Sequence, residues 1–230
     1  MIPHEFDDIR GWKIAYSMDL GFHEVDEAVR RNTHKALDVF RELGAVVEAV
    51  DIGWSEESIK AALDHLSYCT MGAYILQFYR QDKDQLTGYA RMFAERVQKV
   101  DVMQAYEAEM VTAKMWAALS AVFEHCHLFI CPTIACTGVK ADFDYSKDTV
   151  AINGSPVEPT LGWVMTYPFN MLSRCPVMAL PSGRAANNVP TGIQIVGRPY
   201  DDLSVFQAAA GYENAVGPLF DVRNRPTFDA

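Results

Sequence analysis

A strand, a helix and a second strand follow one another within about forty residues near the start of the chain. The apolar-rich run WKIAYS (12–17) comes after a glycine and predicts a buried strand. In residues 25–43 apolar side chains recur at helical spacing, with Asp26 placed to cap the helix and Gly44 able to end it. The run VVEAVDI (46–52) predicts the second strand. Because two strands joined by a helix in this way form a parallel pair, the stretch predicts an α/β fold.

The rest of the pattern extends the sheet and covers it with helices. Residues 55–125 have helical character throughout, beginning with one long helix (55–81) that a serine, Ser55, would cap. The other elements that the sequence predicts are helices at 85–98 and 102–124, strands at 127–133, 177–181 and 191–197, a hairpin turn at Asn153-Gly154, a short buried helix broken near Pro168, a loop at 182–190, and a last helix at 201–216 ended by Gly217 and Pro218. We therefore expect one α/β domain, residues 1–230, with a mixed sheet flanked by helices.

Composition excludes several classes of partner. A net charge of −10 opposes binding to nucleic acid and to anionic membranes. No apolar run approaches the roughly 20 residues that span a bilayer, and the N-terminus lacks the features of a signal peptide. The five cysteines are odd in number and are not spaced like a secreted disulfide framework, which indicates reduced thiols. We expect a cytoplasmic protein.

One run of sequence, HCHLFICPTIAC (125–136), resembles a metal site in composition but not in spacing. Structural zinc sites bring their ligands in tight pairs, and this run does not supply two such pairs. Its residues 127–131 lie on a predicted strand, where alternate side chains face opposite ways. We expect no metal and no cofactor, with these cysteines in the core.

Two side chains are candidates for a nucleophile, and both are better explained structurally. Ser182 lies in LPSGR, which lacks the Gly-x-Ser-x-Gly turn that presents a catalytic serine. Cys175 stands beside Arg174, which could lower a thiol pKa, but its place at the start of a strand favours a buried cysteine. The segment WVMTYPFNM (163–171) is typical either of a core helix or of a small-molecule pocket wall. We expect no catalytic residue in this chain.

The C-terminal quarter resembles the C-terminal signature region of the amidase signature family. The segment from PFNMLSRCPVMALPSG through VPTGIQIVGRPYDD matches the family pattern, in which two glycine- and proline-marked strands precede an acidic residue and a helix. Upstream, IRGWKIAYSMDLGF and HLFICPT resemble further family segments. The positions that carry the match are Asn170, Pro176, Pro181, Gly183, Pro190, Gly192, Gln194, Gly197, Asp202 and Glu213. The resemblance implies the C-terminal portion of the amidase signature fold.

The resemblance also implies a chemistry whose residues lie elsewhere. In this family a serine attacks an amide carbonyl, a second serine relays its proton and a lysine is the base, all in the N-terminal half of the fold. This chain contains no Gly-Gly or Ser-Ser dipeptide of the kind found in that half. We therefore expect a chain that is inactive alone and that completes the sheet and one wall of a cleft for a small-molecule amide. The implied substrate-binding residues are Thr133, Trp163, Thr166 and Asn170.

A chain without its catalytic half has two expected partners, the missing half or a second copy of itself in a dimer, because an incomplete fold leaves surface uncovered. Two other functions stay open. The chain could be a non-catalytic binding or scaffold module, or it could be one component of a split amidase or of an amidotransferase.

Overall fold

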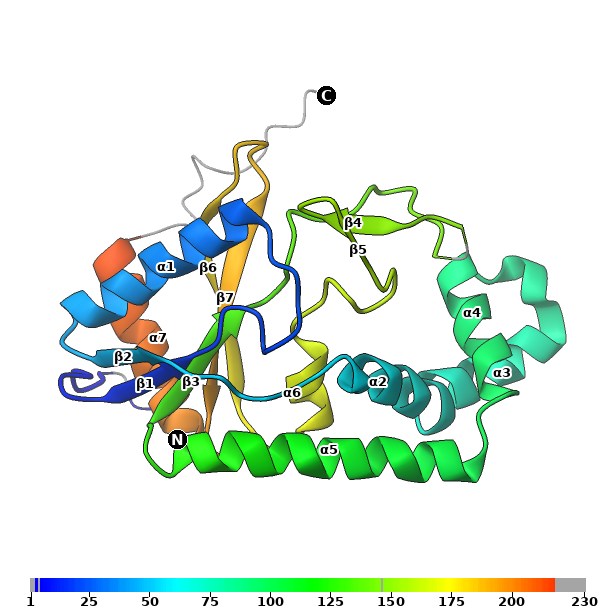
Figure 1. The fold of residues 1–230 in the computed structure, drawn as a ribbon, viewed down its shortest axis with the longest axis horizontal. Helices are drawn as coiled ribbons and strands as arrows, with labels where there is room; N and C mark the ends of the chain where they lie inside the picture. Colours follow the sequence, from blue (N-terminus) through cyan, green and yellow to red (C-terminus); the bar gives the residue numbers. More distant parts are fainter. Residues whose placement is uncertain (1–2, 4, 146, 218–230) are drawn as a thin grey trace.

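The computed structural model describes residues 3, 5–145 and 147–217 of the 230-residue chain. Its centre is a five-stranded mixed sheet with strand order β2-β1-β3-β7-β6 (Figure 1). Strand β1 pairs in parallel with both β2 and β3, whereas β7 pairs antiparallel with β3 and β6. The strands are β1 (Lys13–Tyr16), β2 (Val46–Ala49), β3 (Leu128–Pro132), β6 (Val177–Arg184) and β7 (Pro190–Gly197). The predicted mixed sheet and the parallel pair near the N-terminus are confirmed.

Helices cover the sheet on both faces, and alternate strand residues divide between two cores. Ile130 and Ile195 pack with helices α1 (Glu27–Glu42) and α7 (Asp202–Val216), where Phe40 stacks on Tyr212 at 5.3 Å between ring centroids. Their strand neighbours pack on the other face with α5 (Val102–Phe123) and α6 (Tyr167–Met171). This alternation follows from the two-residue period of a strand.

The first helix has both of its predicted ends. The Asp26 carboxylate accepts a hydrogen bond of 2.7 Å from the backbone nitrogen of Ala28, which satisfies one of the free N–H groups of the first turn. Gly44 follows the helix with φ of +91°, a conformation that side chains disfavour.

The long helix predicted at 55–81 is wrong, because the chain forms two helices there. They are α2 (Glu57–Tyr68) and α3 (Met71–Asp82), separated at Cys69 and Thr70. Gly72 explains the break: a Cβ atom at this position would collide with the carbonyl oxygen of Ser67 and lie 2.8 Å from that of Phe93. The chain therefore turns where α3 comes close to its neighbours. A short 3₁₀ turn η1 (Lys83–Gln85) and α4 (Gly88–Val97) follow.

Three smaller expectations also need correction. Ser55 is not the cap of α2, because the N-cap residue is Glu56 and its side chain makes no capping bond. Pro168 lies in the first turn of α6 and does not break it, since a proline there lacks only an N–H that the helix does not use. Strand β6 continues past the predicted end at Pro181, with an irregular register between Pro181 and Gly183, so the predicted loop at 182–190 is shorter.

The remaining elements agree with the sequence. The hairpin turn at Asn153-Gly154 joins β4 (Val150–Ile152) to β5 (Ser155–Val157), and both turn residues have positive φ. Helix α7 has Gly217 as its C-cap, whereas Pro218 lies outside the described residues. In the part of the chain that the structure describes, no helix combines the length and apolarity that a bilayer span requires.

Candidate functional site

The sheet topology places a switch point between β1 and β3. From β1 the chain crosses through α1 to β2 on one side, whereas β3 lies on the other side of β1, so the loops after these two parallel strands diverge. Such a switch point at the carboxyl ends of strands is where open α/β sheets bind ligands. The chain after β1 is bonded both to β3 and to the loop that follows it: Ser17 nitrogen donates to Ile130 oxygen, within β3, at 3.1 Å, and Asp26 nitrogen donates to Ala135 oxygen at 2.8 Å.

A glutamine in the sheet anchors the segments beside this switch point. The side-chain nitrogen of Gln194, on β7, donates to the carbonyl oxygens of Met165 at 2.8 Å and Pro132 at 3.0 Å, and it lies 3.2 Å from the sulfur of Cys131. Gln194 is fully buried, so the two bonds form away from water and fix the end of β3 against the approach to α6.

Three of the four predicted site residues lie next to one another at this anchor. Thr133 directly follows β3, and its carbonyl oxygen accepts a hydrogen bond of 3.0 Å from Met165 nitrogen. The carbonyl oxygen of Trp163 accepts one of 2.9 Å from Ala135 nitrogen, so the segments that carry Thr133, Trp163 and Thr166 run side by side.

The side chains of these residues differ in what they can offer a ligand. The Thr133 hydroxyl donates to the Gly192 carbonyl oxygen at 3.2 Å, and the indole nitrogen of Trp163 donates to the Pro159 carbonyl oxygen at 3.0 Å. Asn170 stands apart in α6, where its side chain is exposed. The structure therefore groups Thr133, Trp163 and Thr166 and leaves Asn170 one helical turn away.

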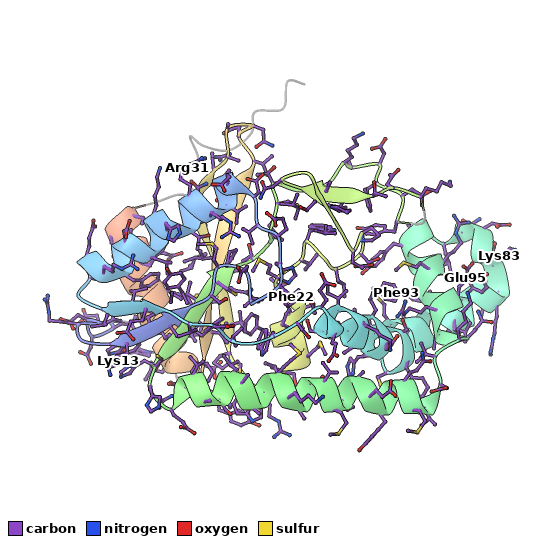
Figure 2. The ribbon with its side chains drawn as sticks, in the orientation of Figure 1. Lys13, Phe22, Arg31, Lys83, Phe93 and Glu95 are labelled. Atoms are coloured by element: carbon purple, nitrogen blue, oxygen red, sulfur yellow. The ribbon has the colours of Figure 1, made fainter. Side chains whose placement is uncertain are left out.

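Trp163 lines a cavity of about 1130 Å³ between the helices α3 and α4 and the segments 143–145 and 160–164. Its wall includes other aromatic side chains, and the ring of Tyr145 lies 5.0 Å from that of Tyr89 and 4.9 Å from that of Phe143. Figure 2 shows Lys83 and Glu95, which also line this cavity, on the side of the molecule away from the sheet. The cavity thus combines a planar apolar wall with a charged rim.

A second cavity, of about 730 Å³, lies between the loop after β1, helix α2 and the β4–β5 hairpin. Phe22, near the centre of the molecule in Figure 2, lines it together with His23. Burial lowers the pKa of His23 below 6.5, although its bond to Gly162 and the charge of Asp19 oppose that shift. The imidazole is therefore neutral at neutral pH. A carbonyl oxygen can only accept, so Nδ1 carries the proton and donates to Gly162 oxygen at 2.9 Å, which leaves Nε2 as an acceptor.

The two cavities share Arg96, which forms an ion pair with a buried carboxylate that sequence reasoning missed. Asp64, whose side chain is 2% exposed, accepts from Lys60 at 2.8 Å and from Arg96 at 2.6 Å, and Arg96 lines both cavities. The Lys60–Asp64 spacing of four residues on a helix is a signal that could have been found in the sequence. Arg96 lies 32 residues further along the chain from Asp64, and no local pattern connects them.

The nucleophile candidates have structural roles in the fold. The Ser182 hydroxyl is buried and lies 2.9 Å from that of Thr191. Burial raises the pKa of Cys175 to about 11 and raises that of Cys131 as well, so both are protonated thiols at neutral pH. Among the described residues no cluster of three or more His, Cys, Asp or Glu side chains could hold a metal ion.

Comparison with known proteins finds the same family over most of the chain. The family model Amidase matches residues 6–206. An acylamidase of Rhodococcus erythropolis is 27% identical over 93% of this chain and 44% of its own length. The A subunit of the glutamyl-tRNA(Gln) amidotransferase of Latilactobacillus sakei is 26% identical over 90% of this chain and 45% of its own. Among solved structures, a bacterial aryl acylamidase of the amidase signature family superposes with a TM-score of 0.79 and 27% identity, over 90% of this chain and 44% of that one. The chain thus spans less than half the length of these relatives.

Proposed function

The chain belongs to the amidase family, and from this premise we propose that it forms the C-terminal part of an enzyme that hydrolyses a carboxamide C–N bond. In this proposal residues 1–230 are a single domain that completes the central sheet and forms one wall of the substrate cleft.

The proposal rests on a comparison of two shares: how much of this chain matches each relative, and how much of the relative's length that match covers. About nine tenths of this chain matches each of the relatives described above, yet the match accounts for only 44–45% of their length. The sequence resemblance assigns the matching part to the C-terminal half, and the switch point between β1 and β3 is a position at which open α/β sheets bind ligands.

The catalytic half lies outside residues 1–230 in this proposal, either in the same polypeptide or in a separate chain. The lysine and two serines of the family chemistry belong to that half. Within the described residues, the hydroxyl of Ser182 is engaged in the sheet and the thiol of Cys175 is protonated, so neither replaces the missing nucleophile. We expect residues 1–230 alone to be inactive on amides.

In this proposal the substrate wall consists of Thr133, Trp163, Thr166 and Asn170, of which Trp163 lines the larger cavity. The aromatic rings of Tyr89, Tyr145 and Trp163 in the larger cavity favour an amide that carries a planar apolar group, because such groups stack on aromatic side chains. That one structural relative is named an aryl acylamidase supports the same substrate class.

Two partners and one compartment complete the proposal. The catalytic half is the first partner, and a second copy of the chain is the other. The five cysteines are free thiols, four of them buried, which supports the reducing environment of the cytoplasm.

The first experiment measures the mass of the protein in the source cells by blotting with an antibody raised against this chain. A band near twice 25.7 kDa supports a complete amidase that contains both halves, and a band at 25.7 kDa directs the search to a separate catalytic chain. In parallel, purified chain is incubated with anilides and simple carboxamides, and with a serine-reactive phosphonate. We expect neither turnover of the amides nor labelling by the phosphonate. Turnover that the phosphonate blocks would contradict the proposal that the catalytic serines lie outside residues 1–230.

A further inference from the structure

Helix α5 buries one face and leaves the opposite face uncovered. Its buried positions, facing the sheet and α2, are Ala105, Ala108, Met115, Leu119 and Phe123. Figure 1 shows α5 along the lower edge of the molecule, with the other labelled helices and strands to one side of it. The opposite face carries an apolar stripe at helical spacing: Met103, Tyr106, Met110, Ala113, Ala117 and Ala121, all exposed. The first three are 58%, 58% and 44% exposed, unusual values for large apolar side chains on one face.

The residues of this stripe are ordered by size. Its N-terminal half holds the three large side chains, and its C-terminal half holds three alanines. We propose that two copies of this chain pair through α5, antiparallel across a twofold axis that passes between residues 110 and 113.

In this arrangement each large side chain meets a small one. Met110 packs on Ala113 of the second copy, Tyr106 on its Ala117 and Met103 on its Ala121, and the twofold axis repeats each contact. Facing positions that alternate large and small fill the space between two helices without voids or overlap. A parallel pair would place Tyr106 against Tyr106 and alanine against alanine, which leaves gaps in one half of the contact.

The charged side chains beside the stripe also favour antiparallel pairing, independently of side-chain size. Glu107 and Lys114 lie seven residues apart on one side of the stripe, and neither has an ion-pair partner among the described residues of its own chain. Antiparallel pairing keeps this side of both helices together and brings Glu107 close to Lys114 of the second copy, twice per dimer. Parallel pairing places this side of the two helices on opposite sides of the contact, so that Glu107 and Lys114 cannot pair. Such flanking pairs select orientation in paired helices.

The interface has enough length and leaves the candidate site free. The 22 residues of α5 extend about 33 Å at 1.5 Å per residue. Neither of the two cavities described above is lined by a residue of α5, so pairing does not close them. The inference therefore does not depend on the proposed hydrolase function.

The test is the mass of the purified chain in solution, measured by light scattering and sedimentation at micromolar concentrations. We expect twice 25.7 kDa. Ala117→Arg places a charge against Tyr106 of the second copy and should give a monomer. Ala215→Arg, at an exposed alanine of α7, is the matched control and should stay dimeric. A monomeric wild-type chain, or a dimer that survives Ala117→Arg, would overturn the proposal.

A charge exchange tests the orientation and does not depend on whether the arginine variant folds. Glu107→Lys and Lys114→Glu should each raise the dimer dissociation constant roughly two- to tenfold at low salt, because each creates a like-charge contact. The double variant restores opposite charges across the interface and should return the constant to the wild-type value. A double variant that dissociates as readily as the single ones would rule out antiparallel self-pairing and point to another surface or partner.

Discussion

The side-chain nitrogen of Gln194 lies 2.8 Å from the carbonyl oxygen of Met165, and this contact joins the middle of the sheet to the segment that precedes α6. The same nitrogen donates to the carbonyl oxygen of Pro132, at the end of β3. One side chain thus holds the two segments that carry Thr133 and Trp163 in a fixed relation. The geometry of the proposed substrate wall therefore depends on the hydrogen bonds that the buried Gln194 side chain makes behind it.

Replacing Gln194 with leucine should destabilise the fold substantially. The substitution keeps the approximate size of the side chain but leaves two buried carbonyl oxygens without donors, which costs roughly 2–4 kcal/mol in the free energy of unfolding. Urea denaturation measures the loss. Gln207→Leu is the control, since its side chain donates one exposed hydrogen bond to Asp8 oxygen and its loss should cost less than about 1 kcal/mol. Equal losses would show that the Gln194 bonds are unimportant.

The elements that could be predicted from the sequence are those whose signals are local. Asp26 and Gly44 mark the ends of α1 by their own chemistry, and Asn153-Gly154 marks a hairpin turn in the same way. The break between α2 and α3 has no such mark. It arises because Gly72 allows a close approach to Phe93, which is distant in sequence and close only in the fold.

The candidate site shows the same limit. The resemblance placed Thr133 and Trp163 near a ligand, and the fold brings their segments together by backbone pairing. Sequence alone did not reveal that Gln194 anchors them or that Arg96 reaches Asp64, because such contacts depend on how separate elements pack. Tertiary contacts between distant residues therefore account for what was missed.

The two cations on Asp64 should contribute unequally to stability. Lys60 is 60% exposed and pairs within its own helix, whereas Arg96 is 35% exposed and connects α4 to α2. We expect Arg96→Leu to lower the free energy of unfolding by roughly 2 kcal/mol, and Lys60→Leu by less than about 1 kcal/mol, because an exposed pair on one helix is worth little. Chemical denaturation of both variants gives the comparison, and a larger loss for Lys60→Leu would contradict it.

His23 should make the fold less stable in mild acid. Burial lowers its pKa in the folded state below 6.5, so between these two values the unfolded chain binds more protons than the folded one. The contribution to stability is fully present above pH 6.5 and is lost as the pH falls through that value toward the folded pKa. His23→Asn can keep the donor to Gly162 oxygen without the titration, and should flatten this part of the stability profile.

The measurement is the urea midpoint as a function of pH between about 5 and 8, for wild type, His23→Asn and a control. His125→Asn is the control because this histidine is exposed. We expect the control to retain the wild-type slope. If His23→Asn also retains it, another group is responsible for the acid sensitivity.

Trp163 should contribute directly to binding of an aromatic amide. Its ring lines the larger cavity and its indole nitrogen is fixed by the Pro159 carbonyl oxygen, so the ring is held in place before a ligand arrives. Removing a stacking surface of this kind costs roughly 0.5–1.5 kcal/mol beyond the lost apolar contact. Trp163→Ala should therefore weaken binding of an anilide at least several-fold, whereas Trp163→Phe should retain most of it.

Calorimetric titration with the anilide measures its dissociation constant for the purified wild-type chain and for both Trp163 variants. Trp116→Ala is the matched control, because this tryptophan lies on α5 and outside the cavity, and the variant should bind as the wild type does. If Trp163→Ala binds the anilide as tightly as the wild type, the substrate wall lies elsewhere on this half of the fold. The switch point between β1 and β3 then becomes a better candidate than the larger cavity, because its position in the sheet does not depend on the Trp163 ring.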